Sequence, residues 1–391
     1  MVKHLILGLA TFSAAAPEHG SFPSFDAWSR LHRKAYADGA ERELRRAVYA
    51  DTVARYTRRN AAEGPHGARY AADRNSDRTE VELQARSCFA SAAPGDPTRP
   101  PAPPRHRTPV FSAAELAAAA GPAAPSIDWR SRGAVTPVQQ QHPFGTCWAF
   151  SLVAVAEGVM VAQGGKQLAK LSEQNVVSCV PKDDCAQTAD QTVPGLGSAT
   201  GGRLQLDADY PYNRTCNFVR EEVLAPDGTR DGYNGTCNDS VPLLHGHCTP
   251  CPGIARIDGT PPCRASNASA FSEARLADWG YVPVGSPADD APMVAALAKY
   301  GPLQIAIATA CLHGYSGGII SNCSSTGNQG HAVTIVGAGT DGASGQGYWV
   351  VKNSWDVTFG EQGFYRVARS PVQMSMDGGF LGCFEKGCYK R

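Results

Sequence analysis

The chain has 391 residues, and its 36 basic and 36 acidic side chains give a formal charge of zero at pH 7. This balance gives no reason to expect a nucleic acid or an anionic membrane surface as a partner. The length leaves room for more than one domain. Thirteen cysteines indicate the oxidising secretory route, where disulfides persist.

Residues 1–16 are predicted to be a secretory signal peptide. They begin with the basic Lys3 and His4, continue with an apolar stretch at residues 5–12 and end on small residues, which is the order that such peptides have. The apolar stretch is too short to span a bilayer, and no later stretch is long enough. We therefore expect the protein to enter the secretory pathway and to reach a lysosome, a vacuole or the outside of the cell. We also expect it to be a monomer.

Five Asn-x-Ser/Thr sequences are candidate glycosylation sites, as expected for a secreted chain. Four of the five lie between residues 213 and 267, which suggests an exposed surface segment there. The five asparagines are Asn213, Asn234, Asn238, Asn267 and Asn322.

Helices are predicted within residues 25–60, where a charged, alanine-rich run begins at Glu41. Along this run, certain side chains follow one another at steps of three and four, so they share one face of a helix. They are Glu41, Arg45, Tyr49, Thr52, Tyr56 and Asn60.

Residues 91–124 are rich in proline and alanine, which is typical of a linker that packs little. Such a segment is accessible to proteases. We predict that the chain is cut between about residues 117 and 125, so that residues 125–391 form the mature domain and residues 17–90 precede the linker.

The mature part is expected to form two lobes. A helix from Trp148 to about Gln163 is apolar on most of its faces, so it should be buried. Runs rich in β-branched and aromatic residues predict strands in the later half. These runs are residues 303–308, 332–336, 348–351 and 363–367. The helical lobe would end near residue 212, and the strand-rich lobe would start near residue 274.

Three residues in separate short motifs suit thiol chemistry. Cys147 begins the predicted helix, whose N-terminal end favours an anion. A thiol attacks a carbonyl usefully as the thiolate, and an adjacent imidazolium lowers its pKa. His331 would serve as base and then as acid. Asn353 would hold the His331 ring in the correct tautomer.

These motifs and their flanks resemble the papain and cathepsin family of cysteine peptidases, and the cathepsin L branch best. The resemblance extends from about residue 25 to about residue 383. The matching stretches are residues 128–130, 133–138, 141–151, 171–174, 210–212, 330–333 and 348–355. It implies an α+β, papain-like fold of two lobes, one helical and one β-barrel-like, preceded by a helical inhibitory prosegment.

The resemblance also implies the activity. It predicts a cysteine endopeptidase that is made as an inactive zymogen and cleaves peptide bonds through an acyl-enzyme, without a metal or a cofactor. Its partners would be protein or peptide substrates and its own prosegment. Gln141 takes the place of the oxyanion-hole side chain, an interaction worth about 3–4 kcal/mol in comparable enzymes. Trp355 would cover the contact between His331 and Asn353.

Residues 17–90 correspond to the prosegment in this resemblance. The helical face that begins at Glu41 is similar to the family pattern Glu-Arg-Phe-Asn-Ile-Asn. Tyr49, Thr52 and Tyr56 depart from that pattern. Asn75 stands where an aromatic residue is usual, so docking of the prosegment at that point is expected to differ.

The resemblance places a substrate along Gly201 and Gly202, whose backbone would pair with an extended peptide. The pocket for the second residue before the scissile bond would involve Leu204 and Ala306, with Cys388 as a further candidate at its base. Their apolar character predicts a preference for Leu, Val or Phe. On the leaving-group side, the chain departs from the family at two positions, with Phe359 in place of Trp and Asp356 in place of Gly. The family resemblance therefore does not predict the shape of that surface or of the turn within it.

Disulfides are expected partly from the resemblance. The family bridge near the nucleophile is absent, because Phe144 and Ala199 occupy its two positions. The predicted pairs are Cys179 with Cys216, Cys323 with Cys383, and Cys311 with Cys388. Five other cysteines follow Cys179, so at least one thiol is left over or pairs elsewhere, for example with Cys88.

Residues 217–271 are an insertion relative to the family and are rich in Cys, Gly and Pro. We interpret them as a disulfide-stapled loop. Zinc binding by Cys248, Cys251, His245 and His247 is the alternative.

Two other functions stay open. His245 and His247 could receive a substrate's C-terminal carboxylate, as in a cathepsin B-like carboxydipeptidase. A catalytically degenerate binding protein is the third reading. It is favoured by His142, Phe144 and the two departures on the leaving-group side, and it is opposed by the intact Cys147, His331, Asn353 and Gln141.

Overall fold

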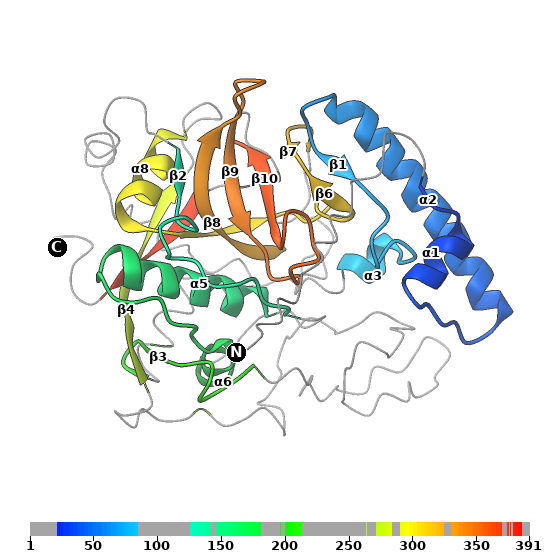
Figure 1. Ribbon diagram of the computed structural model, residues 1–391. Coiled ribbons are helices and arrows are strands. Elements are labelled where there is room, and N and C mark those ends of the chain that lie inside the picture. The colour runs from blue at the N-terminus through cyan, green and yellow to red at the C-terminus, as the bar shows by residue number, and fades with distance from the viewer. Residues whose placement is uncertain are drawn as a thin grey trace, which may run out of the picture.

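The computed structural model describes residues 22–84, 126–141, 146–180, 196, 200–212, 263, 271–283, 290–323, 330–369, 374, 376 and 378–384. Three parts are visible in Figure 1: an N-terminal helical segment, a layer around a long helix, and a large, mostly antiparallel sheet. The predicted signal peptide, the linker and nearly all of the insertion lie outside the described residues.

The N-terminal segment contains α1 (Phe25–Leu31), α2 (Gly39–Glu63), β1 (Arg69–Tyr70) and α3 (Glu80–Gln84). Asp38 caps α2 by accepting a hydrogen bond of 2.8 Å from the Glu41 amide, which satisfies one of the unpaired donors at the helix start. Arg45, Tyr49, Thr52 and Tyr56 are buried along one side of α2. The predicted helical face is therefore confirmed as the packing face.

A small core holds this segment together. Phe25 and Trp28 of α1 pack against Tyr49 of α2, and the rings of Trp28 and Tyr49 lie 4.8 Å apart. The buried Arg45 guanidinium pairs with Glu82 at 2.8 Å, so α3 is fastened to α2.

The helical lobe is built around α5 (Cys147–Ala162), close to the predicted helix. Nearly every one of its residues is buried, because it lies between the middle of the sheet and α6 (Glu173–Cys179). The α6 helix in turn contacts β3 (Arg203–Gln205), the strand at one edge of the sheet. The Ser151 hydroxyl donates to the Val333 carbonyl at 2.8 Å. That bond fixes α5 against the strand that begins at His331.

The sheet has the strand order β3-β4-β11-β5-β8-β9-β10-β7, with β2 pairing β8. The elements of this lobe are β2 (Ile127–Asp128), β4 (Phe271–Pro283), α8 (Ala291–Tyr300), β5 (Leu303–Ile307), β6 (Tyr315–Gly317), β7 (Ile319–Ile320), β8 (His331–Thr340), β9 (Gly347–Lys352), β10 (Phe364–Ala368) and β11 (Gly378–Phe384). All four strands that the sequence predicts are confirmed, as β5, β8, β9 and β10.

The N-terminal segment docks on one edge of the strand-rich lobe, next to β6 and β7 (Figure 1). Its strand β1 pairs antiparallel with β6. The Ala71 amide donates to the Gly314 carbonyl at 2.8 Å. Gly314 has φ +75°, and a Cβ there would lie 2.3 Å from the ring of Tyr56, so this contact needs glycine.

The end of α2 is attached to the same edge through a carboxylate. Glu63 accepts hydrogen bonds from the Ser321 hydroxyl at 2.8 Å, the Ser321 amide at 3.1 Å and the Asn322 amide at 3.2 Å. Asn322, a candidate glycosylation site, is exposed. The other four candidate asparagines lie outside the described residues.

Two disulfides differ from the predicted pairs. Cys179 is bonded to Cys263, not to Cys216, and Cys323 is bonded to Cys311, not to Cys383. The pairing of Cys311 with Cys388 is therefore also wrong. The physical reason is the path of the chain: it turns back through β6 and β7, which brings the Cα atoms of Cys311 and Cys323 to 6.2 Å.

The position of Cys383 explains why it does not pair with Cys323. The Met374 amide donates to the Cys323 carbonyl, so the chain just before β11 passes close to Cys323. The strand then advances by about 3.4 Å per residue, which carries its later residues away from that point. The Cα atoms of Cys179 and Cys263 are 4.5 Å apart, within the range for a bridge.

Candidate active site

His331 and Asn353 lie at neighbouring strand ends. His331 is the first residue of β8, and Asn353 directly follows the last residue of β9. Because these strands are antiparallel, the start of one meets the end of the other. His331 Nε2 and Asn353 Oδ1 are 2.8 Å apart, and both side chains are buried. The other ring nitrogen, Nδ1, has no hydrogen-bond partner among the described residues.

Cys147 approaches the same place from the helical lobe. It is the first residue of α5 and carries a free, buried thiol. The Ala332 amide lies 3.5 Å from Cys147 Sγ and points its hydrogen at it. Ala332 directly follows His331, so the structure brings together the three residues that the sequence singles out, from two lobes and three elements.

Gln141 is held beside them by the segment that follows Asn353. Its amide donates to the Ser354 carbonyl at 2.9 Å, and its Oε1 accepts from the Ser354 hydroxyl at 2.5 Å. With Oε1 turned to Ser354, the side-chain donors are the Nε2 hydrogens. The Ser354 amide also donates to Asn353 Oδ1 at 2.8 Å, so one residue orients both side chains.

Ser354 had no role in the sequence prediction. Its place between Asn353 and Trp355 in one motif was a usable signal, since all three residues must then lie at the same strand end. What the sequence could not show is that its hydroxyl meets Gln141, which lies 213 residues earlier.

The Trp355 ring lies against the His331 ring. The two rings are stacked with centroids 4.8 Å apart. The Phe359 ring stands edge-on to Trp355 at 5.3 Å, so it supplies an aromatic contact in place of the expected Trp. Asp356 adopts φ 75°, and its carboxylate accepts from the Thr358 amide at 3.0 Å. Asp tolerates this left-handed conformation better than most residues, which explains how it replaces Gly.

Burial shifts both titratable groups toward their neutral forms. It raises the pKa of the Cys147 thiol to about 11 and lowers the pKa of His331 to about 4, where the hydrogen bond that His331 donates to Asn353 acts in the opposite direction. Transfer of the proton from thiol to imidazole creates two opposite charges at once. Their attraction would oppose both shifts.

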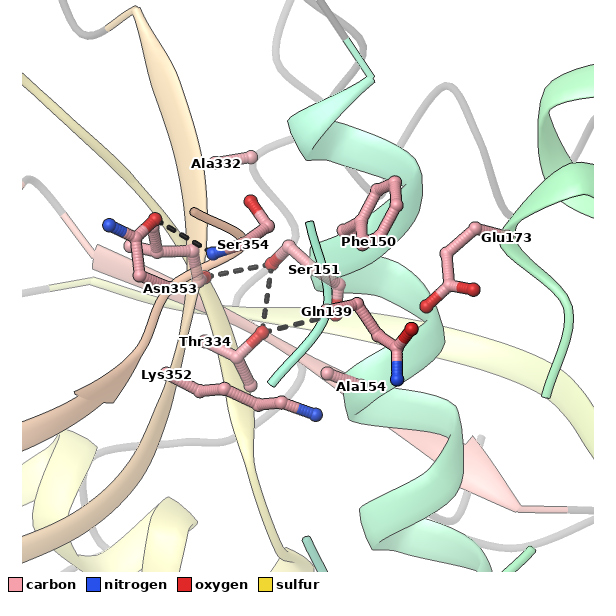
Figure 2. A pocket seen from close by; sticks show the side chains of 11 residues that line it. Gln139, Phe150, Ser151, Ala154, Glu173, Ala332, Thr334, Lys352, Asn353 and Ser354 are labelled. Carbon is pink, nitrogen blue, oxygen red and sulfur yellow. Dashed lines mark hydrogen bonds between the residues drawn. The ribbon is translucent and has the colours of Figure 1, made fainter. Parts of the chain in front are cut away.

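A small cavity lies behind these residues, between α5 and the sheet (Figure 2). Ser151, Thr334 and Lys352 line it, together with Asn353 and Ser354. Lys352 is buried and donates to Thr136 at 2.8 Å. It thus reaches a buried cluster of charged and polar side chains that joins the two lobes. The members of that cluster are Thr136, Glu157, Lys170, Glu173 and Lys352.

The predicted substrate residues have different fates. Ala306 lies beside the site, because it pairs with Ala332 across β5 and β8. Leu204 is fully buried in the core of the helical lobe, which does not fit the prediction that it lines a pocket. The Gly202 amide and carbonyl are bonded to Leu196 and to Leu276, and the Gly201 carbonyl accepts from Arg275. Backbone pairing of the two glycines with a substrate stays a prediction.

Within the described ranges, no cluster of three or more His, Cys, Asp and Glu side chains is placed to hold a metal ion. The alternative zinc ligands His245, His247, Cys248 and Cys251 lie outside those ranges, as does Cys388. In the part of the chain that is described, no helix is long and apolar enough to cross a membrane.

The profile described as "Papain family cysteine protease" matches residues 123–378. Cysteine proteinase B of Leishmania mexicana is 32% identical over 354 residues, which cover 88% of this chain and 64% of the proteinase. Cathepsin S of Mus musculus is 27% identical over 361 residues, which cover 88% of this chain and 85% of that protein. The chain spans 64–65% of the length of the Leishmania and Trypanosoma brucei proteinases that it matches.

Solved structures with a similar fold include proforms. The digestive procathepsin L 3 of the Tenebrio molitor larval midgut matches with a TM-score of 0.61 and 23% identity, and the match covers 92% of this chain and 97% of that one. The recombinant stem bromelain precursor matches with a TM-score of 0.61 and 23% identity, over 93% and 98% of the two chains. Each alignment leaves out only 7–8% of this chain, so both extend into the N-terminal helical segment.

Proposed function

Since the chain belongs to the papain family of cysteine proteases, we propose that it is a cysteine endopeptidase with Cys147 as its nucleophile. One observation carries this proposal. The free Cys147 thiol lies against the residue that follows His331, while His331 is bonded to Asn353 through Nε2 and keeps Nδ1 unbonded within the described part of the chain.

The proposed reaction uses these groups in sequence. His331 Nδ1 accepts the thiol proton, and the thiolate attacks the substrate carbonyl carbon. The oxyanion that forms accepts hydrogen bonds from the Cys147 amide and from Gln141 Nε2. When the C–N bond breaks, the imidazolium gives its proton to the leaving amine. Water, deprotonated by His331, then attacks the thioester and releases the acid.

Asn353 and Trp355 support the imidazole in this scheme. Asn353 Oδ1 can only accept, so the hydrogen bond requires a hydrogen on His331 Nε2, and Nδ1 is the basic nitrogen of the neutral ring. Trp355 stacks on that ring and shields the bond from water, which strengthens it.

Covalent labelling tests the proposal. The matured protein would be treated with an epoxide inhibitor of thiol peptidases, and the adduct would be located by mass spectrometry. We expect one adduct, on Cys147, and none in a Cys147→Ala variant. Folded, mature protein that takes no label and cleaves no peptide would contradict the proposal and favour a binding protein. Equal cleavage of peptides with free and amidated C-termini would separate an endopeptidase from a carboxydipeptidase.

We also propose that residues 17–90 form the inhibitory prosegment. Cleavage within the linker would remove this prosegment while the protein is in the secretory pathway. The support is the docking of β1 on β6 and the bonds from Ser321 and Asn322 to Glu63. Hydrogen bonds to a charged group contribute about 1.5–3 kcal/mol. Glu63→Gln should therefore weaken inhibition by about tenfold or more, and the zymogen should mature faster.

The matched control is Glu43→Gln, which removes an exposed carboxylate from the same helix. Glu43 pairs only with arginines of its own helix among the ion pairs described. Equal maturation rates for both variants would mean that Glu63 does not fasten the prosegment.

A further inference from the structure

We propose that Tyr212 is a positioning residue that holds the two oxyanion donors at a fixed spacing. The inference rests on the proposed function and adds to it a residue that touches neither the thiol nor the imidazole in any contact described. Tyr212 Oη lies 3.1 Å from the Gln141 carbonyl oxygen and 2.9 Å from Thr146 Oγ1. It therefore reaches both the residue with one donor and the neighbour of the other.

The direction of these two bonds follows from the chemistry of the groups. A carbonyl can only accept, so Tyr212 donates its single hydroxyl hydrogen to Gln141. The Thr146 hydroxyl must then donate to Tyr212. The result is a directed chain from Thr146 through Tyr212 to Gln141, which spans the four residues between the two ends.

Thr146 gives a further indication. It is the N-cap residue of α5, and a threonine in that place usually accepts a hydrogen bond from the first turn of the helix. Here its side chain makes no such bond. Its hydroxyl is engaged with Tyr212 instead, so it serves to connect the helix start with Gln141.

The Tyr212 ring is itself anchored. It stands edge-on to Phe150 on the first turns of α5, with ring centroids 4.9 Å apart. Two residues earlier, the Tyr210 backbone carbonyl accepts a hydrogen bond from the Ser172 hydroxyl, and Pro211 restricts the backbone between the two tyrosines. The hydroxyl of Tyr212 is therefore presented from a fixed part of the helical lobe.

The site has a need for such a connection. An oxyanion donor works when it lies about 2.7–3.1 Å from the position of the oxyanion. The two donors here, on Gln141 and Cys147, belong to residues six apart, and the family bridge near this segment is absent because Phe144 and Ala199 replace its cysteines. Ser354 holds Gln141 from the strand-rich lobe, and Tyr212 would hold it from the helical lobe.

The test uses Tyr212→Phe in the full chain, followed by maturation. This change removes the hydroxyl and keeps the ring against Phe150. The matched control is Tyr210→Phe, which removes a hydroxyl from the same motif. The Tyr210 hydroxyl donates to the Ser178 hydroxyl of α6 at 3.0 Å and makes no contact with Gln141 in the interactions described. Three quantities would be compared: kcat/KM for a peptide, the inhibition constant of a peptide aldehyde, and the rate of Cys147 alkylation by iodoacetamide.

The aldehyde forms a tetrahedral adduct that needs the oxyanion donors, whereas alkylation needs only the thiolate. We expect Tyr212→Phe to lower kcat/KM and to weaken aldehyde binding, each by about tenfold, the size of one lost hydrogen bond. The alkylation rate of Tyr212→Phe should stay within about twofold of the wild-type rate. Tyr210→Phe should change none of the three quantities by more than about twofold. If the Tyr212 hydroxyl only stabilised the fold, its removal would change the aldehyde affinity and the alkylation rate by similar factors.

Thr146→Val provides a second variant. It should reproduce the loss, and the double variant should lose little more, because both changes break one chain of bonds. Equal effects of Tyr212→Phe and Tyr210→Phe would overturn the inference, and so would a parallel fall in alkylation. A wild-type protein that is alkylated yet cleaves no peptide and binds no aldehyde would instead overturn the proposed function.

Discussion

The two halves of the candidate site are held in different ways. His331 and Asn353 lie at the ends of β8 and β9, whose backbones are joined by a ladder that runs from Thr334 and Lys352 onward. Cys147 begins a helix, and Gln141 precedes it by six residues. One backbone hydrogen bond joins Gln141 to Ser354, and side-chain hydrogen bonds from Ser354 and Tyr212 add to it. A continuous backbone ladder therefore fixes the first half, while the second depends mainly on individual side chains.

This difference predicts where substitutions matter. On the strand half, an altered neighbour leaves the ladder and therefore the His331 position unchanged. On the helix half, the hydrogen bond from Ser354 and the chain of hydrogen bonds from Thr146 through Tyr212 are two separate constraints, so the loss of either should lower activity directly. The tests below run from the largest expected effect to the smallest.

The largest effect is expected from His331→Ala. It removes the proposed base and acid, which typically contributes 10²–10⁴-fold, so kcat should fall by about 10²–10⁴-fold. Thermal unfolding should still be cooperative, because the β8 ladder remains. A variant that keeps more than a tenth of wild-type kcat would show that another group takes the proton.

Gln141→Ala comes next. Loss of one oxyanion donor lowers kcat by about 10²–10³-fold in comparable enzymes. The rate of Cys147 alkylation should be nearly unchanged, since the donor acts after the thiolate has formed. A parallel loss of alkylation would mean that Gln141 orders the whole helix half and is not specific for the oxyanion.

Stability should depend on pH through His331. Its folded pKa of about 4 is below the ordinary value of 6.5, so the native state favours the neutral ring. That contribution is fully present above pH 6.5 and is lost as the pH falls to 4, by about 3 kcal/mol. Urea unfolding of an inactive Cys147→Ser chain should show this loss.

The comparison chain for that measurement carries His331→Gln in addition. It cannot titrate at this position, so its free energy of unfolding should change less between pH 6.5 and 4. Equal pH dependence in both chains would mean that the buried imidazole does not contribute.

The smallest effect is expected from Ser354→Ala. It removes the hydroxyl that orients Gln141 but keeps the Ser354 amide on Asn353. A lost hydrogen bond of this kind corresponds to about 0.5–1.5 kcal/mol, so kcat/KM should fall by about three- to tenfold. Two quantities would be measured for this variant: the pH profile of kcat/KM, which reports on His331, and the affinity for the aldehyde. A larger change in the pH profile than in the aldehyde affinity would contradict the comparison of the two halves.

The local elements could be predicted from the sequence alone. Apolar continuity indicated α5, periodic steps of three and four gave the buried face of α2, and β-branched runs located β5, β8, β9 and β10. The motifs also singled out Cys147, His331, Asn353 and Gln141, which the structure brings together. These features depend on neighbouring residues, whose spacing the chain displays directly.

Only the tertiary structure decided what meets across long separations. The partners of Cys179 and Cys323, the full burial of Leu204 and the contacts of Ser354 and Tyr212 with Gln141 all depend on how the lobes and strands pack. The residues next to a cysteine or a hydroxyl group do not identify its partner elsewhere in the chain, and several partners are compatible with the same local sequence. The path of the backbone removes that ambiguity, because it sets which of these groups come within bonding distance.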